Sequence, residues 1–180
     1  MALKAIEKLE TAYFEMLENM HYSKITVSEV IARAGVSRTT FYRHYVDVFD
    51  MHKKVAEKMG SVILDTCIKE IVQSKNEDEC FEKILNIFNS QEKYIICIAG
   101  ENGSRYFFEA MYHNVSKALE PAFGNVTEEQ IFRLQFMTIS MIATYVKDLL
   151  EGREHNTRYI AICKKLLNFE ELFGGHYAEK

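Results

Sequence analysis

The chain has 180 residues, and its 48% hydrophobic and 27% charged content is typical of a globular protein and excludes wholesale disorder. A single proline excludes collagen-like and proline-rich proteins, and no apolar run reaches the roughly 18 to 20 residues that span a bilayer. The net charge of −4 argues against a protein that binds polyanions over its whole surface.

Two helices are predicted near the N-terminus. Apolar residues recur every three or four positions over residues 3–20, which is the pattern of an amphipathic helix. Thr26 and Glu29 are spaced as a capping box, in which each side chain binds the free backbone N–H of the other residue. The second helix therefore begins after Thr26, and we expect it to end near Ala34.

A third helix and a long fourth helix follow after short connections. Gly35 can adopt the left-handed conformation that ends a helix, and Ser37 stands where the cap of the next helix belongs. The third helix is expected over about residues 38–45. Asp47 can cap a fourth helix, which is expected over about residues 48–73.

The rest of the chain is also predicted to be helical. Because glycine lowers helix stability, Gly60 within the fourth helix indicates a close approach of another helix. The polar residues 74–79 break the pattern and are the best candidate for a domain boundary. No run alternates convincingly as a strand would, although residues 94–100, YIICIAG, are ambiguous. Further helices are predicted over about 79–90, 92–99, 104–120, 128–151 and 157–173, which makes an all-α protein of about nine helices.

Residues 26–45 hold the most informative chemistry. A helix of about nine residues, a tight turn and a second short helix is the spacing of a helix-turn-helix. From Lys24 to Lys54 there are six Lys or Arg against three Asp or Glu, so a basic segment lies in an acidic chain. The residues expected to fill the crook between the helices are Val30, Ile31, Val36, Phe41 and Tyr45, and those expected to face outward are Arg38, Thr39, Tyr42, Arg43 and His44.

The outward residue types suit DNA. Arginine makes bidentate contacts to guanine, short hydroxyl side chains and helix N-terminal amides bind phosphate, and an exposed tyrosine offers a flat apolar body with a hydroxyl. The alternative for each is ordinary surface or packing chemistry: the arginines would be solvated charges, and Tyr42 and His44 would pack against their neighbours.

A family resemblance rests on one string of residues: Thr26, Ala34-Gly35-Val36-Ser37, Arg38-Thr39-Thr40, Phe41-Tyr42 and His44-Tyr45. With this string, residues 3 to about 60 resemble the N-terminal domain of TetR/AcrR-family transcriptional regulators. The resemblance implies a helix-turn-helix DNA-binding domain over 1–47, a connecting helix over 48–73, and a helical ligand-binding and dimerisation domain over 74–180.

The resemblance also implies which residues touch DNA. Base edges would be read by Arg38, Thr39 and Arg43. Phosphates would be contacted by Thr26, Ser37, Thr40, Tyr42 and His44.

Two positions depart from the family pattern. The family typically has a lysine at the start of the fourth helix that neutralises a phosphate, and this chain has Val48 there. Lys53 or Lys54, a turn later, would substitute, or one phosphate contact is absent. Ile31 replaces a residue that is usually alanine, so we expect the two helices of the motif to cross slightly farther apart.

The C-terminal half is expected to bind a second copy of the chain. Broad apolar faces on the helices predicted over 128–151 and 157–173 would form a four-helix interface in a homodimer, although both faces could instead be buried within one subunit. Aromatic residues between positions 81 and 145 predict either an ordinary core or a pocket for a small hydrophobic or aromatic effector. The candidate ligand-binding residues are Tyr94, Arg105, Phe108, Tyr112, His113 and Gln135, with Asn114 as a further polar anchor.

The predicted function is sequence-specific transcriptional regulation by a homodimer on a palindromic DNA operator. A ligand-responsive repressor is favoured over an activator, since blocking a promoter by occupying it needs no further contact. The alternative within this fold is an activator or coactivator that works through a protein partner with weak or no DNA binding. An enzyme is not expected, because the sequence has no paired carboxylates, nucleophile set or phosphate loop at usable spacing.

Compartment and cofactors follow from the cysteines and the first residues. Cys67, Cys80, Cys97 and Cys163 lie far apart without zinc-ligand spacing, so we expect free, mostly buried thiols and neither a metal nor a cofactor. The first ten residues, MALKAIEKLE, carry charges where a signal peptide is apolar, which favours a cytoplasmic protein without a membrane partner.

Overall fold

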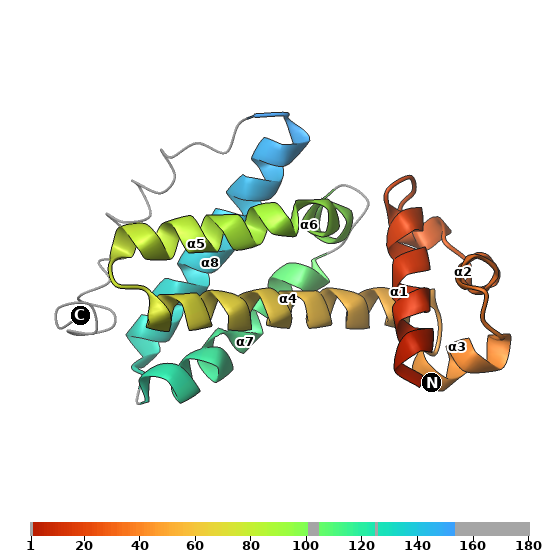
Figure 1. The fold of residues 1–180 in the computed structure, drawn as a ribbon, viewed down its shortest axis with the longest axis horizontal. Helices are drawn as coiled ribbons and strands as arrows, with labels where there is room; N and C mark the ends of the chain where they lie inside the picture. The colour runs from red at the N-terminus through yellow and green to blue at the C-terminus, as the bar shows by residue number, and fades with distance from the viewer. Residues whose placement is uncertain (1, 101–104, 125, 154–180) are drawn as a thin grey trace.

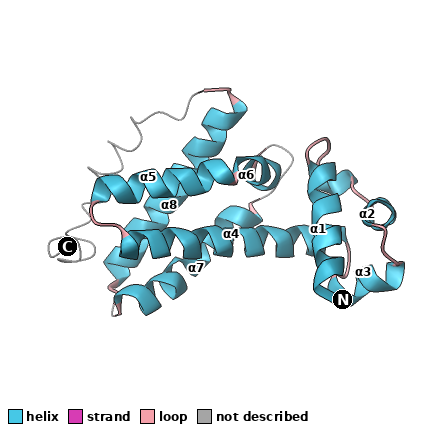
Figure 2. Cartoon of the chain, in the orientation of Figure 1, coloured by secondary structure: helices cyan, strands magenta, loops and turns pink. Residues whose placement is uncertain are grey.

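The computed structural model describes residues 2–100, 105–124 and 126–153, and over these ranges the chain is all-α (Figures 1 and 2). The described part holds eight α-helices and one short 3-10 helix, without a strand. The ambiguous YIICIAG segment is helical up to Ala99, and Gly100 follows the helix in an extended conformation. No helix among the described residues has the length and apolar character needed to cross a membrane. The helix predicted over 157–173 lies outside the described residues.

Four short elements form the N-terminal end of the molecule. The capping box at Thr26 and Glu29 is present, and Gly35 has a φ of 63°, so both predicted signals of the second helix are confirmed. The first helix ends at Leu17, earlier than predicted, and the chain then forms a 3-10 turn capped by the His21 side chain. The elements are α1 (Ala2–Leu17), η1 (Tyr22–Lys24), α2 (Val27–Ala34) and α3 (Arg38–His44).

The long helix α4 (Val48–Gln73) connects this end to the remaining helices (Figure 1). Asp47 caps it as predicted, because the Asp47 side chain accepts from the Asp50 N–H. Thr127 forms the capping box predicted for the last described helix. These remaining helices are α5 (Glu77–Ser90), α6 (Glu92–Ala99), α7 (Tyr106–Phe123) and α8 (Glu128–Leu150).

Gly60 lies where α4 packs on α7, as its position in the sequence predicts. A Cβ atom at Gly60 would lie 3.2 Å from the Cβ of Ala110 and 3.3 Å from the carbonyl oxygen of Phe107. The absent side chain therefore lets the two backbones approach closely.

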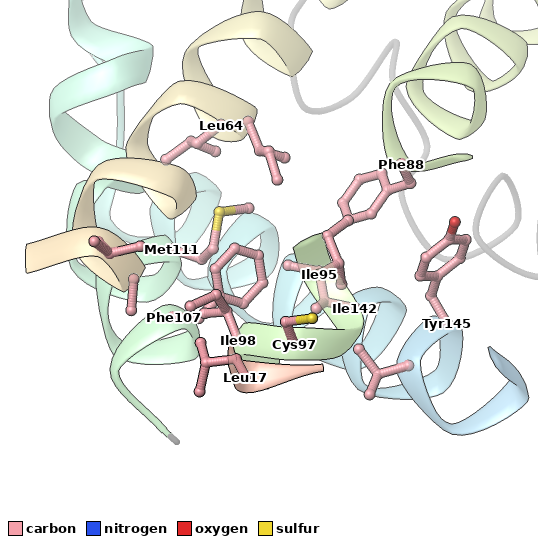
Figure 3. Close-up of a cluster of buried hydrophobic side chains, with 14 of the residues drawn as sticks. Leu17, Leu64, Phe88, Ile95, Cys97, Ile98, Phe107, Met111, Ile142 and Tyr145 are labelled. Carbon is pink, nitrogen blue, oxygen red and sulfur yellow. The ribbon is translucent and has the colours of Figure 1, made fainter. Parts of the chain in front are cut away.

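One continuous core joins the N-terminal helices to the rest. Leu17, at the end of α1, belongs to the same buried cluster as Ile98 of α6 and Phe107 of α7 (Figure 3). On α4, the His52 ring is also buried, and its Nδ1 atom lies 2.6 Å from the Tyr13 hydroxyl of α1. Helix α1 is thus joined to the later helices both at its C-terminal end and near its middle.

Candidate nucleic-acid interface

Helix α3 begins with its own cap at the edge of the molecule, at the end opposite α5 and α8 (Figure 1). The Ser37 hydroxyl accepts from the Thr40 backbone N–H at 3.1 Å, and it also shares a hydrogen bond of 2.8 Å with the Thr40 hydroxyl. Ser37 is exposed and Thr40 half-buried, so both hydroxyls lie beside the first turn of α3.

The inner face of α3 is fixed by apolar packing. Phe41 is completely buried, as is Val30 of α2, and Tyr45 after the helix is 5% exposed. Ile31 and Val36 are partly buried against the same core. The predicted crook between α2 and α3 is therefore filled as expected, and this packing determines which face of α3 is left for solvent.

The outer face of α3 carries exposed polar side chains. Arg38, Thr39, Tyr42 and Arg43 are all exposed and line one open hollow on the surface. The Arg38 guanidinium donates a hydrogen bond of 3.1 Å to the Tyr42 hydroxyl and lies 5.4 Å from the centre of its ring. Arg38 and Tyr42 therefore hold one another in place on the exposed face.

Thr26 and His44 differ from the other candidate residues. Thr26 is exposed, but its hydroxyl donates to the Glu29 carboxylate at 2.6 Å, and these hydrogen bonds hold the pKa of Glu29 below its usual range. The His44 side chain is half-buried instead of facing outward. Its Nε2 atom is buried and has no hydrogen-bond partner among the described residues.

The position of the missing family lysine is apolar in this structure. Val48 is 8% exposed and packs in the core, so no charge replaces the lysine there. Lys53 and Lys54 are the expected substitutes for that lysine. The Nζ atom of Lys53 lies 3.9 Å from Oε1 of Glu57, one turn farther along α4. Lys54 reaches back to the end of α3, where its ammonium donates to the carbonyl oxygen of His44 at 3.1 Å.

The six candidate ligand-binding residues do not line one cavity. A narrow apolar cavity of about 60 Å³ lies among α4, α5, α7 and α8, and none of the six lines it. Tyr94 instead faces a groove of about 520 Å³ between α1, α4, α5 and α6. The centres of the Tyr94 and Phe14 rings lie 4.8 Å apart there. Arg105 is exposed and pairs with Glu109, and Gln135 donates to the Tyr112 carbonyl oxygen.

The remaining two candidates, with the further anchor, also lie apart from that cavity. Phe108 is partly buried against the core, and His113 is exposed on α7. Asn114 donates to the Ser61 hydroxyl of α4 at 3.0 Å. Of the aromatic residues between positions 81 and 145, Phe81 and Phe88 line this cavity. Most of its lining is aliphatic or sulfur-containing, with Leu64, Ile68, Met111 and Met137 among its residues, so aromatic enrichment did not identify it.

Two contacts were not anticipated from the sequence. The Lys54 contact with His44 joins residues of two helices, and the His52 contact with Tyr13 joins residues 39 positions apart. Local spacing carries no signal for either contact, since both depend on how the helices lie against one another. The expectation of buried thiols outside disulfides is confirmed for Cys67, Cys80 and Cys97. Cys163 lies outside the described residues.

Comparisons with known proteins agree with this arrangement at the level of the fold. No protein-family profile matches the chain, and no curated protein sequence matches it. The crystal structure of the TetR family repressor AlkX from Dietzia sp. strain DQ12-45-1b, implicated in biodegradation of n-alkanes, is similar, with a TM-score of 0.59. The match covers 96% of this chain and 97% of that one, at 12% identity. The chain therefore has the all-α fold of a TetR family repressor.

Proposed function

We propose that this protein is a sequence-specific DNA-binding transcriptional regulator that acts as a homodimer on a palindromic operator, as a ligand-responsive repressor. The observation that carries the proposal is the outer face of α3. Arg38, Thr39, Tyr42 and Arg43 are exposed together there, while Phe41 holds the opposite face in the core. A short helix with this face fits the major groove, and arginine and threonine there read base edges.

The contacts divide by chemistry. Arg38, Thr39 and Arg43 read bases, and Ser37, Thr40 and Tyr42 contact phosphates through hydroxyls near the beginning and middle of α3. The Thr26 hydroxyl already donates to the Glu29 carboxylate, so it would contact a phosphate only by dividing its hydrogen bond between the two acceptors. Because Nε2 of His44 is buried, a phosphate contact from this side chain would have to come from Nδ1.

A dimer is supported by the exposed face of α8. Phe132 and Phe136 are 63% and 61% exposed, and they lie one helical turn apart. Exposed phenylalanines side by side favour burial against a second copy of the chain. Two copies of α3 in one dimer reach successive major grooves about 34 to 36 Å apart, and the second contact gains from a high effective concentration.

The effector part of the proposal has its support in the apolar cavity beside α4. At about 60 Å³ this cavity is smaller than the roughly 300 Å³ of an ordinary ligand pocket. An effector would therefore have to widen it by moving α5 or α8 away from α4. Such a ligand favours the widened state and lowers operator affinity by the same coupling that makes DNA weaken ligand binding.

The DNA-binding proposal is tested by selecting duplexes from a random pool with the full chain and then measuring affinity for the selected operator. Arg38→Ala is expected to lower operator affinity about 5-fold to 150-fold and to relax selectivity at one base pair. Arg105→Ala removes an exposed arginine just before α7 and should leave affinity unchanged. A chain that selects no duplex would contradict the proposal, and capture of a protein partner without DNA binding would favour the coactivator.

A further inference from the structure

The ammonium of Lys54 lies at the C-terminal end of the exposed helix α3, although Lys54 belongs to α4. Its Nζ atom donates to the carbonyl oxygen of His44 at 3.1 Å and to Oδ2 of Asp50 at 2.9 Å. It also lies 5.7 Å from the centre of the Tyr45 ring. Lys54 thus contacts the last residue of α3 and the residue that follows it.

The end of α3 needs a donor from elsewhere in the chain. The last carbonyl groups of any helix have no partner within the helix and carry partial negative charge. Helix α3 has only seven residues, so few internal hydrogen bonds hold it. An ammonium at the His44 carbonyl supplies both a donor and a positive charge at this end.

Asp50 completes the attachment on the other side of Tyr45. Its Oδ2 atom accepts from the Val46 backbone N–H at 2.9 Å as well as from Lys54. The hydrogen bond from Lys54, followed by that from Val46, keeps the pKa of Asp50 below its usual range, so the carboxylate is charged at neutral pH. Together the two side chains of α4 hold the backbone on both sides of Tyr45.

We infer that Lys54 is a positioning residue for DNA recognition, which with Asp50 sets the orientation of α3 on α4 while making no contact with DNA. This inference rests on the proposed function. Its contribution differs from that of the family lysine, whose place is taken by the buried Val48. In this chain a lysine holds the recognition helix in place, whereas the family lysine binds a phosphate.

Positioning and phosphate binding predict different losses. A phosphate contact carries no sequence information, so its removal weakens binding to every duplex equally and lowers the salt dependence of binding. A misplaced recognition helix loses base contacts in the operator but keeps its attraction for random DNA. The ratio of operator affinity to random-duplex affinity therefore separates the two roles.

The test compares Lys54→Met with Lys53→Met in the full chain. Lys53 is the neighbouring residue, its side chain is exposed to nearly the same extent (48% against 50%), and it lies near Glu57 instead of α3. Affinities for the selected operator and for a random duplex are measured at several salt concentrations, and circular dichroism checks that each variant is folded. If Lys54→Met does not fold, Lys54→Gln takes its place with the same expected ratio.

Lys54→Met is expected to lower operator affinity at least about fivefold and random-duplex affinity less than about twofold, with an unchanged salt slope. Lys53→Met should change both affinities by the same small factor. Equal losses on both duplexes with a salt slope smaller by about 0.9 would overturn the inference in favour of a phosphate contact. Unchanged operator affinity would overturn it as well, while DNA binding by the unaltered chain would still support the proposed function.

Discussion

His52 is a buried titratable side chain where α1, η1 and α4 meet. Its ring stacks on the Tyr22 ring, with the two ring centres 4.2 Å apart and an interplanar angle of 5°. Its Nδ1 atom is hydrogen-bonded to the Tyr13 hydroxyl. Burial, with a smaller contribution from the charge of His21, lowers the pKa of His52 from 6.5 to about 4. The folded chain therefore keeps this ring neutral at a pH where an exposed histidine becomes protonated.

We expect this depressed pKa to make the protein less stable in weak acid. Between pH 6.5 and about 4 the unfolded chain binds a proton at His52 and the folded chain does not, so the free energy of unfolding falls as pH falls. This loss of unfolding free energy is at most about 3 kcal/mol. His52→Phe keeps an aromatic ring without a titratable group and should abolish the loss. Denaturant unfolding of both proteins across this interval measures it, and parallel curves would contradict the expectation.

At the scale of the helices, the contact of α4 with α7 depends on Gly60. Gly60→Leu must place a side chain where a Cβ alone would already lie 3.2 Å from Ala110. We expect the free energy of unfolding to fall by about 1 to 3 kcal/mol, as in other overpacked interiors. Asp65→Leu adds the same side chain at an exposed site of α4 and should change stability by less than about 0.5 kcal/mol. Equal effects of the two substitutions would refute a close contact at Gly60.

The helix boundaries could be predicted from the sequence where their causes are local. Thr26, Ser37, Asp47 and Thr127 each cap a helix through an atom three residues away, so spacing alone identifies them. The contact of Lys54 with the His44 carbonyl oxygen depends on how two helices lie against each other, which no local pattern encodes. The residues that line the apolar cavity could not be assigned for the same reason, since they come from four helices.

At the scale of the whole molecule, the proposed homodimer depends on α8. Replacing both Phe132 and Phe136 with serine is expected to give a monomer, because these are the most exposed phenylalanines of the described chain. Operator affinity should fall by about 100-fold or more when the second recognition helix is no longer tethered. Sedimentation measures the assembly state, and Val62→Ser serves as a control because Val62 is 57% exposed on α4. A double variant that remains dimeric would place the interface elsewhere.

The single helix α4 runs from the N-terminal elements to the far end of α5 (Figure 1), and its 26 residues make it about 39 Å long. A tilt of about 10° at one end of such a rod displaces the other end by about 7 Å, which is about two base-pair steps of B-form DNA at 3.4 Å each. In the proposed regulator, a tilt of this size caused by a rearrangement among α5, α7 and α8 would shift α3 along a DNA duplex by about two base pairs.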